Sequence, residues 1–392
     1  MKIALLCTPM DFHARKWAKA LVDEGQEVVF IHPALDHEPI SGVKMIPIQG
    51  RNPGRWDYLD FWWTVPALKK ILFVEKPDIV NPLHVTPFGV WARQSGYRPV
   101  VNMVLGADVL DYVPSTQSRF WKDSTSPNNW KAALIRFWHR VQVSKSLASA
   151  RLNLGDNQAI CKAIGELSPK AIQRTEVFTW GIPLDTWLPA QGDEKSELRI
   201  RYQIPPNAMV VIAPRGLKAL FYPEVILEVI QQTCSFPEIH WVVLSGHYPV
   251  AESVRSRLSV LTRSGVTWFA APQTEAVVRD LFRLSDVMVS IPGYDGLSAS
   301  LLQALACKVM PVLSDIEGSQ DLIRSGVGLT LLPNHNSSVL FDIVVNCKHL
   351  FKTKDWNDTL EKNHEWVQQH ANLKSCTQEF LRKVSELISE KA

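Results

Sequence analysis

The chain has 392 residues, of which 46% are hydrophobic and 21% charged, and its formal net charge at pH 7 is +3. This composition is typical of a soluble globular protein with two domains of ordinary size, and it excludes a membrane-spanning chain. No CxxC pair occurs among the six cysteines, so their spacing indicates neither a zinc site nor a disulfide framework. Because no signal peptide is recognised either, we expect a cytoplasmic protein.

Charge is unevenly distributed along the chain. Residues 1–180 hold 22 Lys and Arg against 16 Asp and Glu, a net charge of +6, whereas residues 181–392 hold 20 against 23, a net charge of −3. A basic first half suggests an anionic partner for that half, although chance asymmetry explains the numbers equally well.

The first half alternates apolar runs with segments of helical periodicity. We expect strands at 3–7, 27–33, 43–48, 78–83, 99–105 and 150–155, and helices at 14–25, 63–77, 85–96 and 130–148. This alternation predicts a parallel sheet with helices on both faces.

The same pattern restarts after a stretch at 175–197 that is rich in proline, glycine and charge and that we interpret as a linker. Strands are expected at 208–214, 239–246, 265–270, 286–290, 309–314 and 328–332, and helices at 224–234, 274–285, 297–306 and from about 338 onward. The predicted fold is therefore α/β, with two facing Rossmann-like, doubly wound domains. Ligands would bind in an interdomain cleft at the carboxyl ends of both sheets.

The stretch PGYDGLSASLLQALA, at 292–306, joins a predicted strand to a predicted helix. Gly296, Leu297 and Ser298 are expected in the first helical turn, where free N–H groups and the helix dipole suit a phosphate or a sugar hydroxyl. From the residues alone, Asp295 is more typical of a helix cap than of a ligand. Gln303 alone is more typical of a solvated helix position.

The run D-G-L-S-A-S-L-L-Q-A-L-A resembles the E-G-F-G-x-x-x-x-E-A-x-A signature of retaining GT-B glycosyltransferases of the large family 4, also called glycosyl transferases group 1. K-P-D-I-V-N-P-L-H, F-T-W-G-I-P-L-D-T-W and G-V-T-W-F-A-A-P-Q are similar to further family segments, in the family's order. The resemblance implies an acceptor-binding domain at 1–175, a linker at 176–195 and a nucleotide-sugar-binding domain at 196–370. A helix at 371–392 would cross back to the first domain.

The resemblance implies a donor site in the second domain. Asp295 would lie near the donor sugar, and Gln303 would bind the ribose, each in place of a family glutamate. Arg215 and Lys218 would stabilise the departing diphosphate, so both join Asp295 as predicted catalytic residues; without the resemblance they would be interpreted as exposed loop cations. The other predicted donor-binding residues are Gly246, Phe269, Ala270, Gly296, Leu297 and Ser298.

In the first domain, V-V-N-M-V-L-G-A-D-V-L resembles the family's V-V-x-x-x-H-G-x-D-V-L, with Leu105 in place of the histidine. The predicted acceptor-side residues are Asp11, His13, His84, Gly106 and Asp108. For the two histidines, purely structural roles stay open.

A basic amphipathic helix is predicted from about 130. Residues 131–155 contain no acid and five basic residues, which are Lys131, Arg136, Arg140, Lys145 and Arg151. One helical face carries Trp130, Leu134, Phe137, Trp138 and Val141, and Arg136 and Arg140 lie opposite. Two interpretations stay open: a core-facing helix with a solvated basic back, or a helix lying on the anionic cytoplasmic face of a membrane, with a lipid-linked acceptor.

The resemblance implies a retaining glycosyltransferase that moves a glucose-type hexose from a UDP-linked donor to a hydroxyl of a glycan or lipid-linked acceptor, in polysaccharide or glycoconjugate biosynthesis. We expect no metal or other cofactor, because basic residues would meet the diphosphate charge and no Asp-x-Asp motif follows a suitable strand. Nucleic acid is not an expected partner. The alternatives are a GT-B subunit that binds nucleotide sugar without turnover and a GT-B epimerase, for which the paired acids and histidines are not found.

Overall fold

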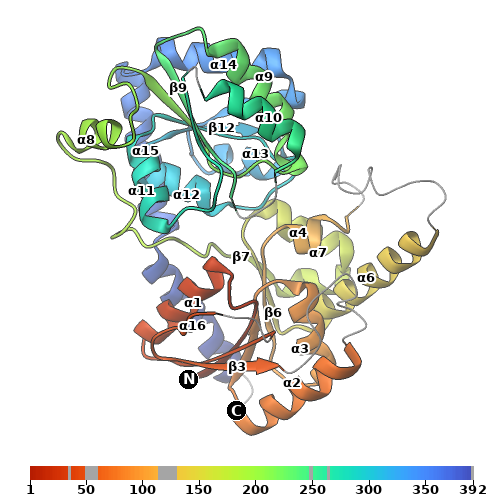
Figure 1. Ribbon diagram of the computed structural model, residues 1–392. Helices are drawn as coiled ribbons and strands as arrows, with labels where there is room; N and C mark the ends of the chain where they lie inside the picture. Colours follow the sequence, from red (N-terminus) through yellow and green to blue (C-terminus); the bar gives the residue numbers. More distant parts are fainter. Residues whose placement is uncertain (34–36, 49–60, 114–129, 247–249, 263–264, 390–392) are drawn as a thin grey trace. The chain divides into compact units, whose positions relative to one another are not determined.

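The computed structural model describes residues 1–33, 37–48, 61–113, 130–246, 250–262 and 265–389, and it divides the chain into two compact units (Figure 1). Unit 1 comprises Met1–Trp180 and Leu373–Ala392, and unit 2 comprises Gly181–Asn372. The divisions fall within the predicted linker and near the start of the predicted crossing helix.

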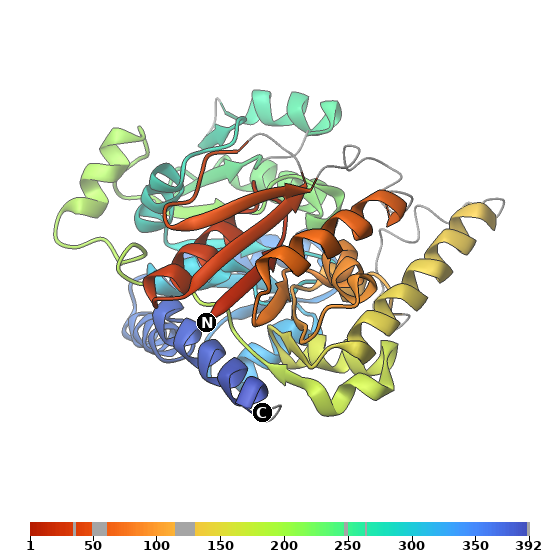
Figure 2. The same ribbon diagram turned by 90° about the horizontal axis from the view of Figure 1, so that it is seen from below.

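Unit 1 is built on parallel strands in the orders β3-β2-β1-β4 and β5-β6-β7. Parallel bridges from Val80 to Val100 and from Leu83 to Met103 join the two groups. In Figure 2 the three red strands β1 to β3 run side by side. The strand bounds are β1 (Lys2–Leu6), β2 (Glu27–Pro33), β3 (Val43–Ile48), β4 (Ile79–Pro82), β5 (Val101–Val104), β6 (Leu152–Gly155) and β7 (Thr175–Val177).

The four predicted helices of unit 1 are present, but the one predicted at 85–96 differs in form. The segment predicted as one helix at 85–96 consists of a π-helical turn, η1 (Val85–Gly89), and a short α-helix, α3 (Val90–Ser95), because Thr86 has the extended angles φ −114° and ψ 122°. The other helices are α1 (Phe12–Asp23), α2 (Phe61–Glu75), α4 (Ala107–Leu110), α6 (Trp130–Ser149), α7 (Gln158–Leu167), η2 (Pro169–Arg174) and α16 (Leu373–Ser389). Of these, α4, α7 and η2 were not predicted.

The last helix, α16, belongs to the core of unit 1. Phe380 is fully buried and its ring packs edge-on against Trp17 of α1, with centroids 5.2 Å apart. Phe178, which follows β7, lies against both rings. Residues near both ends of the chain therefore share one aromatic cluster, and Figure 1 shows α16 beside α1.

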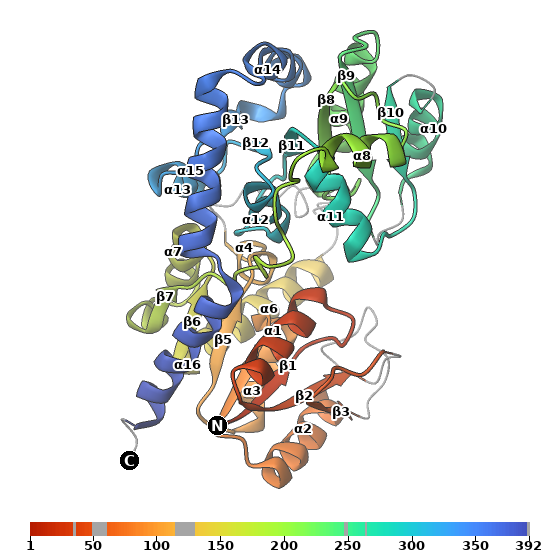
Figure 3. The ribbon, with the colours of Figure 1, turned by 90° about the vertical axis from the view of Figure 1, so that its left-hand side faces the viewer.

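Unit 2 contains a six-stranded parallel sheet in the order β10-β9-β8-β11-β12-β13. Its strands are β8 (Met209–Ala213), β9 (Ile239–Leu244), β10 (Val266–Phe269), β11 (Val287–Ser290), β12 (Met310–Ser314) and β13 (Thr330–Leu332). Alternate residues enter different core clusters. Val211 packs with α9 (Pro223–Thr233), α10 (Glu252–Leu261) and α14 (Ser337–Leu350). Val210 packs with α8 (Glu194–Arg201), α11 (Glu275–Leu284) and α12 (Ala299–Ala306). Helices therefore cover both faces of the sheet, as Figure 3 shows, and most residues of the strands are apolar.

The helices of unit 2 are α8 (Glu194–Arg201), α9 (Pro223–Thr233), α10 (Glu252–Leu261), α11 (Glu275–Leu284), α12 (Ala299–Ala306), α13 (Glu317–Arg324), α14 (Ser337–Leu350) and α15 (Lys354–His370). Two short 3₁₀ turns, η3 (Ala219–Phe221) and η4 (Pro333–His335), follow β8 and β13. The helical tail expected from about 338 is therefore three separate helices, of which the last lies in unit 1.

The predicted linker at 175–197 is wrong at both ends, since it includes β7 and the start of α8. Asp286, buried ahead of β11, accepts hydrogen bonds from Arg199 at 2.7 Å, from Lys195 at 2.6 Å and from the Val210 backbone N–H at 2.8 Å. This carboxylate holds α8 against the sheet. The helix was missed because its sequence, EKSELRIR, is mostly charged and carries no apolar stripe.

Candidate functional site at the carboxyl ends of the strands

Both sheets reverse their strand order beside the first strand of the unit. β1 has β2 on one side and β4 on the other, and β8 has β9 on one side and β11 on the other. In open α/β sheets the loops that leave such neighbouring strands separate, and ligands bind between them. The predicted site residues of each unit follow these strands: Asp11 and His84 in unit 1, Arg215 and Asp295 in unit 2.

In unit 2 the structure brings Arg215 and Asp295 together although 80 residues separate them. The guanidinium contacts the carboxylate through both terminal nitrogens, Nη1 to Oδ2 at 3.1 Å and Nη2 to Oδ1 at 3.2 Å. The guanidinium also lies over the ring of Phe221, 4.9 Å from its centroid. A planar, two-pronged pair of this kind fixes the orientation of the arginine and leaves its other donors available.

The pair is partly enclosed. The side chains of Arg215 and Asp295 are 20% and 23% exposed, so solvent reaches both. Burial raises the pKa of Asp295 above its ordinary value, and the charge of Arg215 opposes that shift. The backbone N–H of Gly296 also donates to Asp295 Oδ1, at 3.1 Å.

Two glycines allow the loops after β8 and β9 to approach closely. Gly216 has φ +78°, and a Cβ there would lie 2.8 Å from the carbonyl oxygen of Ser245. Gly246, a predicted donor-binding residue, also has a positive φ, of +67°. A side chain at Gly216 would thus force the loop carrying Arg215 away from Gly246.

The first turn of α12 differs from the prediction. Gly296, Leu297 and Ser298 precede the helix, which begins at Ala299, because Ser298 is its N-cap and accepts a hydrogen bond from the Leu301 N–H. Asp295 therefore does not cap this helix. The interpretation of Gln303 as a solvated residue is also wrong, since Gln303 is only 7% exposed.

The remaining predicted donor residues lie on neighbouring loops of unit 2. Lys218 is half-buried and precedes the 3₁₀ turn η3, three residues after Arg215. Phe269 ends β10, where its carbonyl accepts a hydrogen bond from the Ser245 N–H at 3.0 Å, and Ala270, which follows, is exposed.

Sequence reasoning missed an aromatic pair that joins four loops of unit 2. The rings of Tyr222 and His335 stack with centroids 3.7 Å apart. His335 Nε2 lies 3.1 Å from both the Ser314 hydroxyl and the Pro292 carbonyl. The strand order alone brings these residues together, and the only local signal is the Tyr-Pro step that opens α9.

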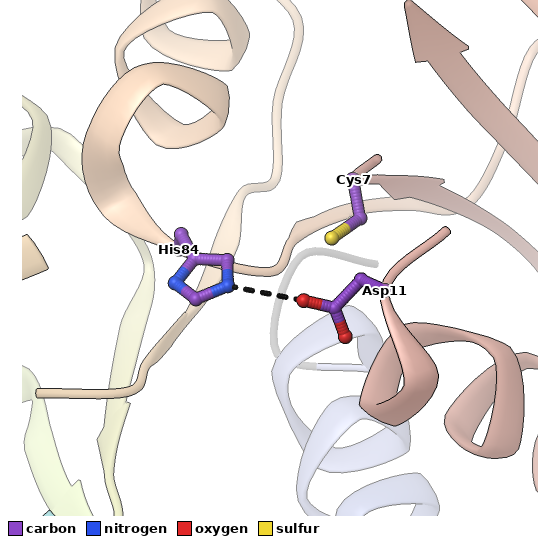
Figure 4. Close-up of side chains that lie close together, drawn as sticks. All are labelled: Cys7, Asp11 and His84. Atoms are coloured by element: carbon purple, nitrogen blue, oxygen red, sulfur yellow. Dashed lines mark ion pairs between the residues drawn. The ribbon is translucent and has the colours of Figure 1, made fainter. Parts of the chain in front are cut away.

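In unit 1, Asp11 and His84 meet at the ends of β1 and β4. Asp11 caps α1 by accepting the Ala14 N–H at 2.9 Å through Oδ1, and its Oδ2 lies 3.6 Å from His84 Nε2. Cys7, at the end of β1, completes the cluster, and Figure 4 shows its sulfur directed toward the same space. Cys7 was missed because only the spacing between cysteines was considered.

Asp108 lies behind His84 and shapes the backbone there. It is 7% exposed and accepts the N–H groups of Val85, at 2.7 Å, and Leu105, at 3.2 Å. Gly106, which follows Leu105 directly, has φ +114° and precedes α4. These contacts make Asp108 a positioning residue for the backbone that follows His84 and for the backbone that follows β5, and His84 itself has a strained φ of +77°.

The charges of the cluster are interdependent. Burial disfavours the Asp11 carboxylate, but His84 and the Ala14 N–H outweigh burial and lower the pKa of Asp11 to about 2. Burial also disfavours the charged form of His84 and by itself would lower its pKa. The negative charges of Asp11 and Asp108 outweigh this effect, so the pKa of His84 is raised. The charge of His13 makes a smaller contribution to lowering the pKa of Asp11, and the His13 ring packs edge-on against Phe12 and Trp180.

The two doubly wound units have the GT-B fold, and the chain is similar to solved structures along its whole length. It is similar to sucrose-phosphate synthase from Thermosynechococcus elongatus, with a TM-score of 0.79 and 15% identity over 100% of both chains. A complex of Anabaena HepE with UDP-glucose gives a TM-score of 0.74 and 14% identity over 98% of this chain and 100% of that one. WaaG, a glycosyltransferase involved in lipopolysaccharide biosynthesis, gives 0.70 and 11% over 97% and 99%. The predicted fold class is confirmed.

Sequence comparisons lead to the family. Residues 2–135 match the family described as Glycosyl transferase 4-like. The chain is 22% identical over 302 residues to a D-inositol 3-phosphate glycosyltransferase of Streptomyces bingchenggensis and 23% identical over 322 residues to one of Rhodococcus erythropolis. These alignments cover 67% and 74% of this chain but 62% and 66% of the relatives, less than two thirds of each. Together the matches confirm the resemblance to family-4-like, group 1 glycosyltransferases.

The predicted basic helix is present as α6. Leu134, Phe137 and Trp138 are 60%, 65% and 38% exposed, so the apolar face of this part of α6 does not face the core. Figure 1 shows α6, in yellow, extending from the rest of unit 1. Among the described helices, none has the length and apolar character needed to cross a membrane.

Proposed function

We propose that the protein is a retaining glycosyltransferase that moves a glucose-type hexose from a UDP-linked donor to a hydroxyl of a glycan or lipid-linked acceptor. The observation that carries the proposal is the Arg215–Asp295 pair, which lies where the strand order of unit 2 reverses. The relationship to group 1 glycosyltransferases and the UDP-glucose complex of HepE support a nucleotide sugar as the ligand of this unit.

Arg215 would stabilise the leaving diphosphate. Breaking the glycosidic bond of a nucleotide sugar concentrates negative charge on the departing phosphate oxygens, and fixed cations lower the energy of that transition state. The carboxylate of Asp295 takes two guanidinium donors and holds the group in place, while solvent still reaches Arg215. Lys218, on the same loop, would add a second positive charge.

The proposed transfer occurs on one face of the sugar. The acceptor hydroxyl attacks the anomeric carbon on the side from which the diphosphate departs, and the departing phosphate oxygen takes the hydroxyl proton. No carboxylate nucleophile is required, which agrees with Asp295 being engaged by Arg215. Because cations of the chain meet the diphosphate charge, we propose that no metal ion acts there.

Replacing Arg215 with alanine tests this assignment. We expect Arg215→Ala to lower kcat for UDP release from UDP-glucose by about a hundred- to a thousandfold, because a preorganised donor is lost. Binding of UDP, measured calorimetrically, should weaken, whereas binding of uridine, which has no phosphate, should not. The matched control is Arg257→Ala, which removes an exposed arginine that pairs with Glu224 in the same unit.

A turnover of Arg215→Ala equal to that of Arg257→Ala would contradict the proposed role. The same assay addresses the alternative of a non-catalytic subunit. If the wild-type chain binds UDP-glucose but releases no UDP with any hydroxyl acceptor, the protein is a nucleotide-sugar-binding subunit.

We also propose that α6 contacts an anionic membrane surface and thereby brings unit 1 to a lipid-linked acceptor. Leu134, Phe137 and Trp138 are exposed one turn apart, which is the arrangement of helices that lie in a bilayer interface. Arg140 and Lys145 are exposed further along the helix. The segment 131–155 holds no acid, so its charge complements anionic headgroups.

Vesicle sedimentation tests the proposed membrane contact. The chain should sediment with vesicles of phosphatidylcholine and phosphatidylglycerol, less at high salt, and little with phosphatidylcholine alone. Because each apolar side chain contributes about 1.5–3 kcal/mol when buried, Leu134→Ser with Phe137→Ser should weaken binding at least tenfold. The matched control, Phe73→Ser with Val74→Ser, removes an equally exposed pair from α2. An equal loss with the control pair would contradict a specific role of α6.

A further inference from the structure

Cys7, Asp11 and His84 form a cluster that differs from a simple hydrogen-bonded pair. One ligand atom from each residue lies within 4.8 Å of the other two. The Asp11 Oδ2 to His84 Nε2 distance of 3.6 Å exceeds the 2.7–3.2 Å of an ordinary N–H···O hydrogen bond. In a tetrahedral zinc site, with ligand bonds of about 2.0–2.3 Å, neighbouring ligand atoms are separated by about 3.3–3.7 Å. The Asp11–His84 distance therefore matches the spacing of two ligands of one ion, and the Cys7 sulfur lies within 4.8 Å of both atoms.

We propose that these three side chains bind a divalent transition-metal ion, of which Zn²⁺ fits best. A cysteine sulfur, an imidazole nitrogen and a carboxylate oxygen are a ligand set that suits zinc and disfavours magnesium and calcium, which prefer oxygen ligands. On binding, Cys7 releases its thiol proton to the solvent and ligates as the thiolate. The site does not depend on the proposed glycosyl transfer and lies entirely in unit 1.

The surroundings hold two of the ligands in position. Asp11 uses Oδ1 to cap α1, which leaves Oδ2 directed at the cluster. His84 adopts the strained φ of +77°, and Asp108 fixes the next residue by accepting the Val85 N–H. Strained backbone at a non-glycine residue costs about 1–3 kcal/mol and is concentrated at functional sites. The strained backbone of His84 positions its imidazole opposite Asp11 and Cys7.

Solvent reaches the cluster, which supplies three protein ligands rather than the four of a closed zinc site. The His84 side chain is 32% exposed and that of Asp11 is 21% exposed, whereas Cys7 is buried. Three protein ligands leave a fourth tetrahedral position, which is the arrangement of sites that bind a water molecule or an external ligand. We therefore expect a site with an exchangeable fourth ligand.

Cobalt substitution tests the proposal on the full, tag-free chain after treatment with a chelator. We expect one equivalent of Co²⁺ to bind and to give a near-ultraviolet thiolate-to-cobalt band together with visible bands of tetrahedral cobalt. Zn²⁺ should abolish both. Cys7→Ser should remove the thiolate band, and the control Cys161→Ser, at another buried cysteine of unit 1, should keep it.

Two further variants keep the fold while removing ligands. Asp11→Asn preserves a good helix cap without the charge, and His84→Asn retains a residue that tolerates positive φ. Each should weaken Co²⁺ binding at least tenfold, with thermal melting of the metal-free protein confirming that the variants are folded. The proposal is overturned if wild-type protein gives no thiolate band with excess Co²⁺. It is also overturned if the band persists in Cys7→Ser or disappears in Cys161→Ser.

Discussion

Arg215 and Asp295 illustrate what single residues reveal in the sequence. Each follows an apolar strand in a motif that resembles a family segment, so both could be selected as site residues. Their two-pronged contact could not be predicted, because it depends on β8 and β11 being neighbours in the sheet. The contact also changes the interpretation of Asp295, which orients Arg215 and does not cap α12. Its predicted contact with the donor sugar stays a prediction.

His240 supplies a pH-dependent stability at the residue scale. It is 6% exposed in β9, and burial, with a smaller contribution from the charge of Arg199, lowers its pKa from 6.5 to about 4. The unfolded chain binds a proton below about pH 6.5 and the folded chain does not until about pH 4. Stability is therefore complete above pH 6.5 and is lost as the pH falls toward 4.

The difference amounts to roughly 2 kcal/mol at pH 5, since each unit of pKa corresponds to about 1.4 kcal/mol. We expect urea unfolding to show a smaller loss between pH 7.5 and pH 5 in His240→Gln than in the wild-type protein. His349→Gln, at an exposed position of α14, is the control and should retain the wild-type loss. An unchanged loss in His240→Gln would show that other groups determine the acid sensitivity.

At the scale of elements, strands were easier to predict than the ends of helices. Every strand of unit 2 could be predicted from a run of apolar residues, because a strand that is buried on both faces has apolar residues at consecutive positions. The start of α12 was predicted too early, since Gly296 to Ser298 resemble a first turn and only the backbone shows that Ser298 is the cap. Among the described α-helices, α4, α7, α8, α10 and α13 were not predicted. Of these, α8 and α10 carry too weak an apolar pattern to be recognised.

The cap of α12 makes a prediction about stability. Removing the Ser298 hydroxyl leaves the Leu301 N–H without this acceptor, so Ser298→Ala should lower the free energy of unfolding by about 1 kcal/mol. Ser298→Asp should preserve it, because aspartate caps as well as serine. Ser300→Ala, inside the helix, is the matched control and should be neutral. Chemical denaturation without nucleotide measures all three, and equal stability of Ser298→Ala and Ser300→Ala would exclude a capping role.

At the scale of the whole molecule, the sequence indicated two doubly wound units, and the restart of the strand and helix pattern was the decisive signal. The sequence could not show which side chains join the C-terminal helix to unit 1. That information lies in the packing of Phe380 with Trp17 and Phe178, residues that no local pattern connects.

The shared aromatic cluster predicts that unit 1 depends on α16. Phe380→Ala creates a cavity in a fully buried cluster and should lower the free energy of unfolding by about 3–5 kcal/mol. Phe73→Ala, at a 74% exposed phenylalanine of α2 in the same unit, should change it by less than about 0.5 kcal/mol. Thermal unfolding that is equally shifted by both substitutions would contradict a core role for α16.

The return of α16 to unit 1 also sets an order of events during synthesis. Residues 181–372, which form the whole of unit 2, leave the ribosome before residues 373–389 do. Domains generally fold as units while the chain is still being synthesised. Unit 2 can therefore finish folding while the core of unit 1 still lacks helix α16. Unit 1 is therefore the first unit to be synthesised and the last to be completed. Until α16 is synthesised, Trp17 and Phe178 expose an apolar surface that can bind chaperones or lead to aggregation.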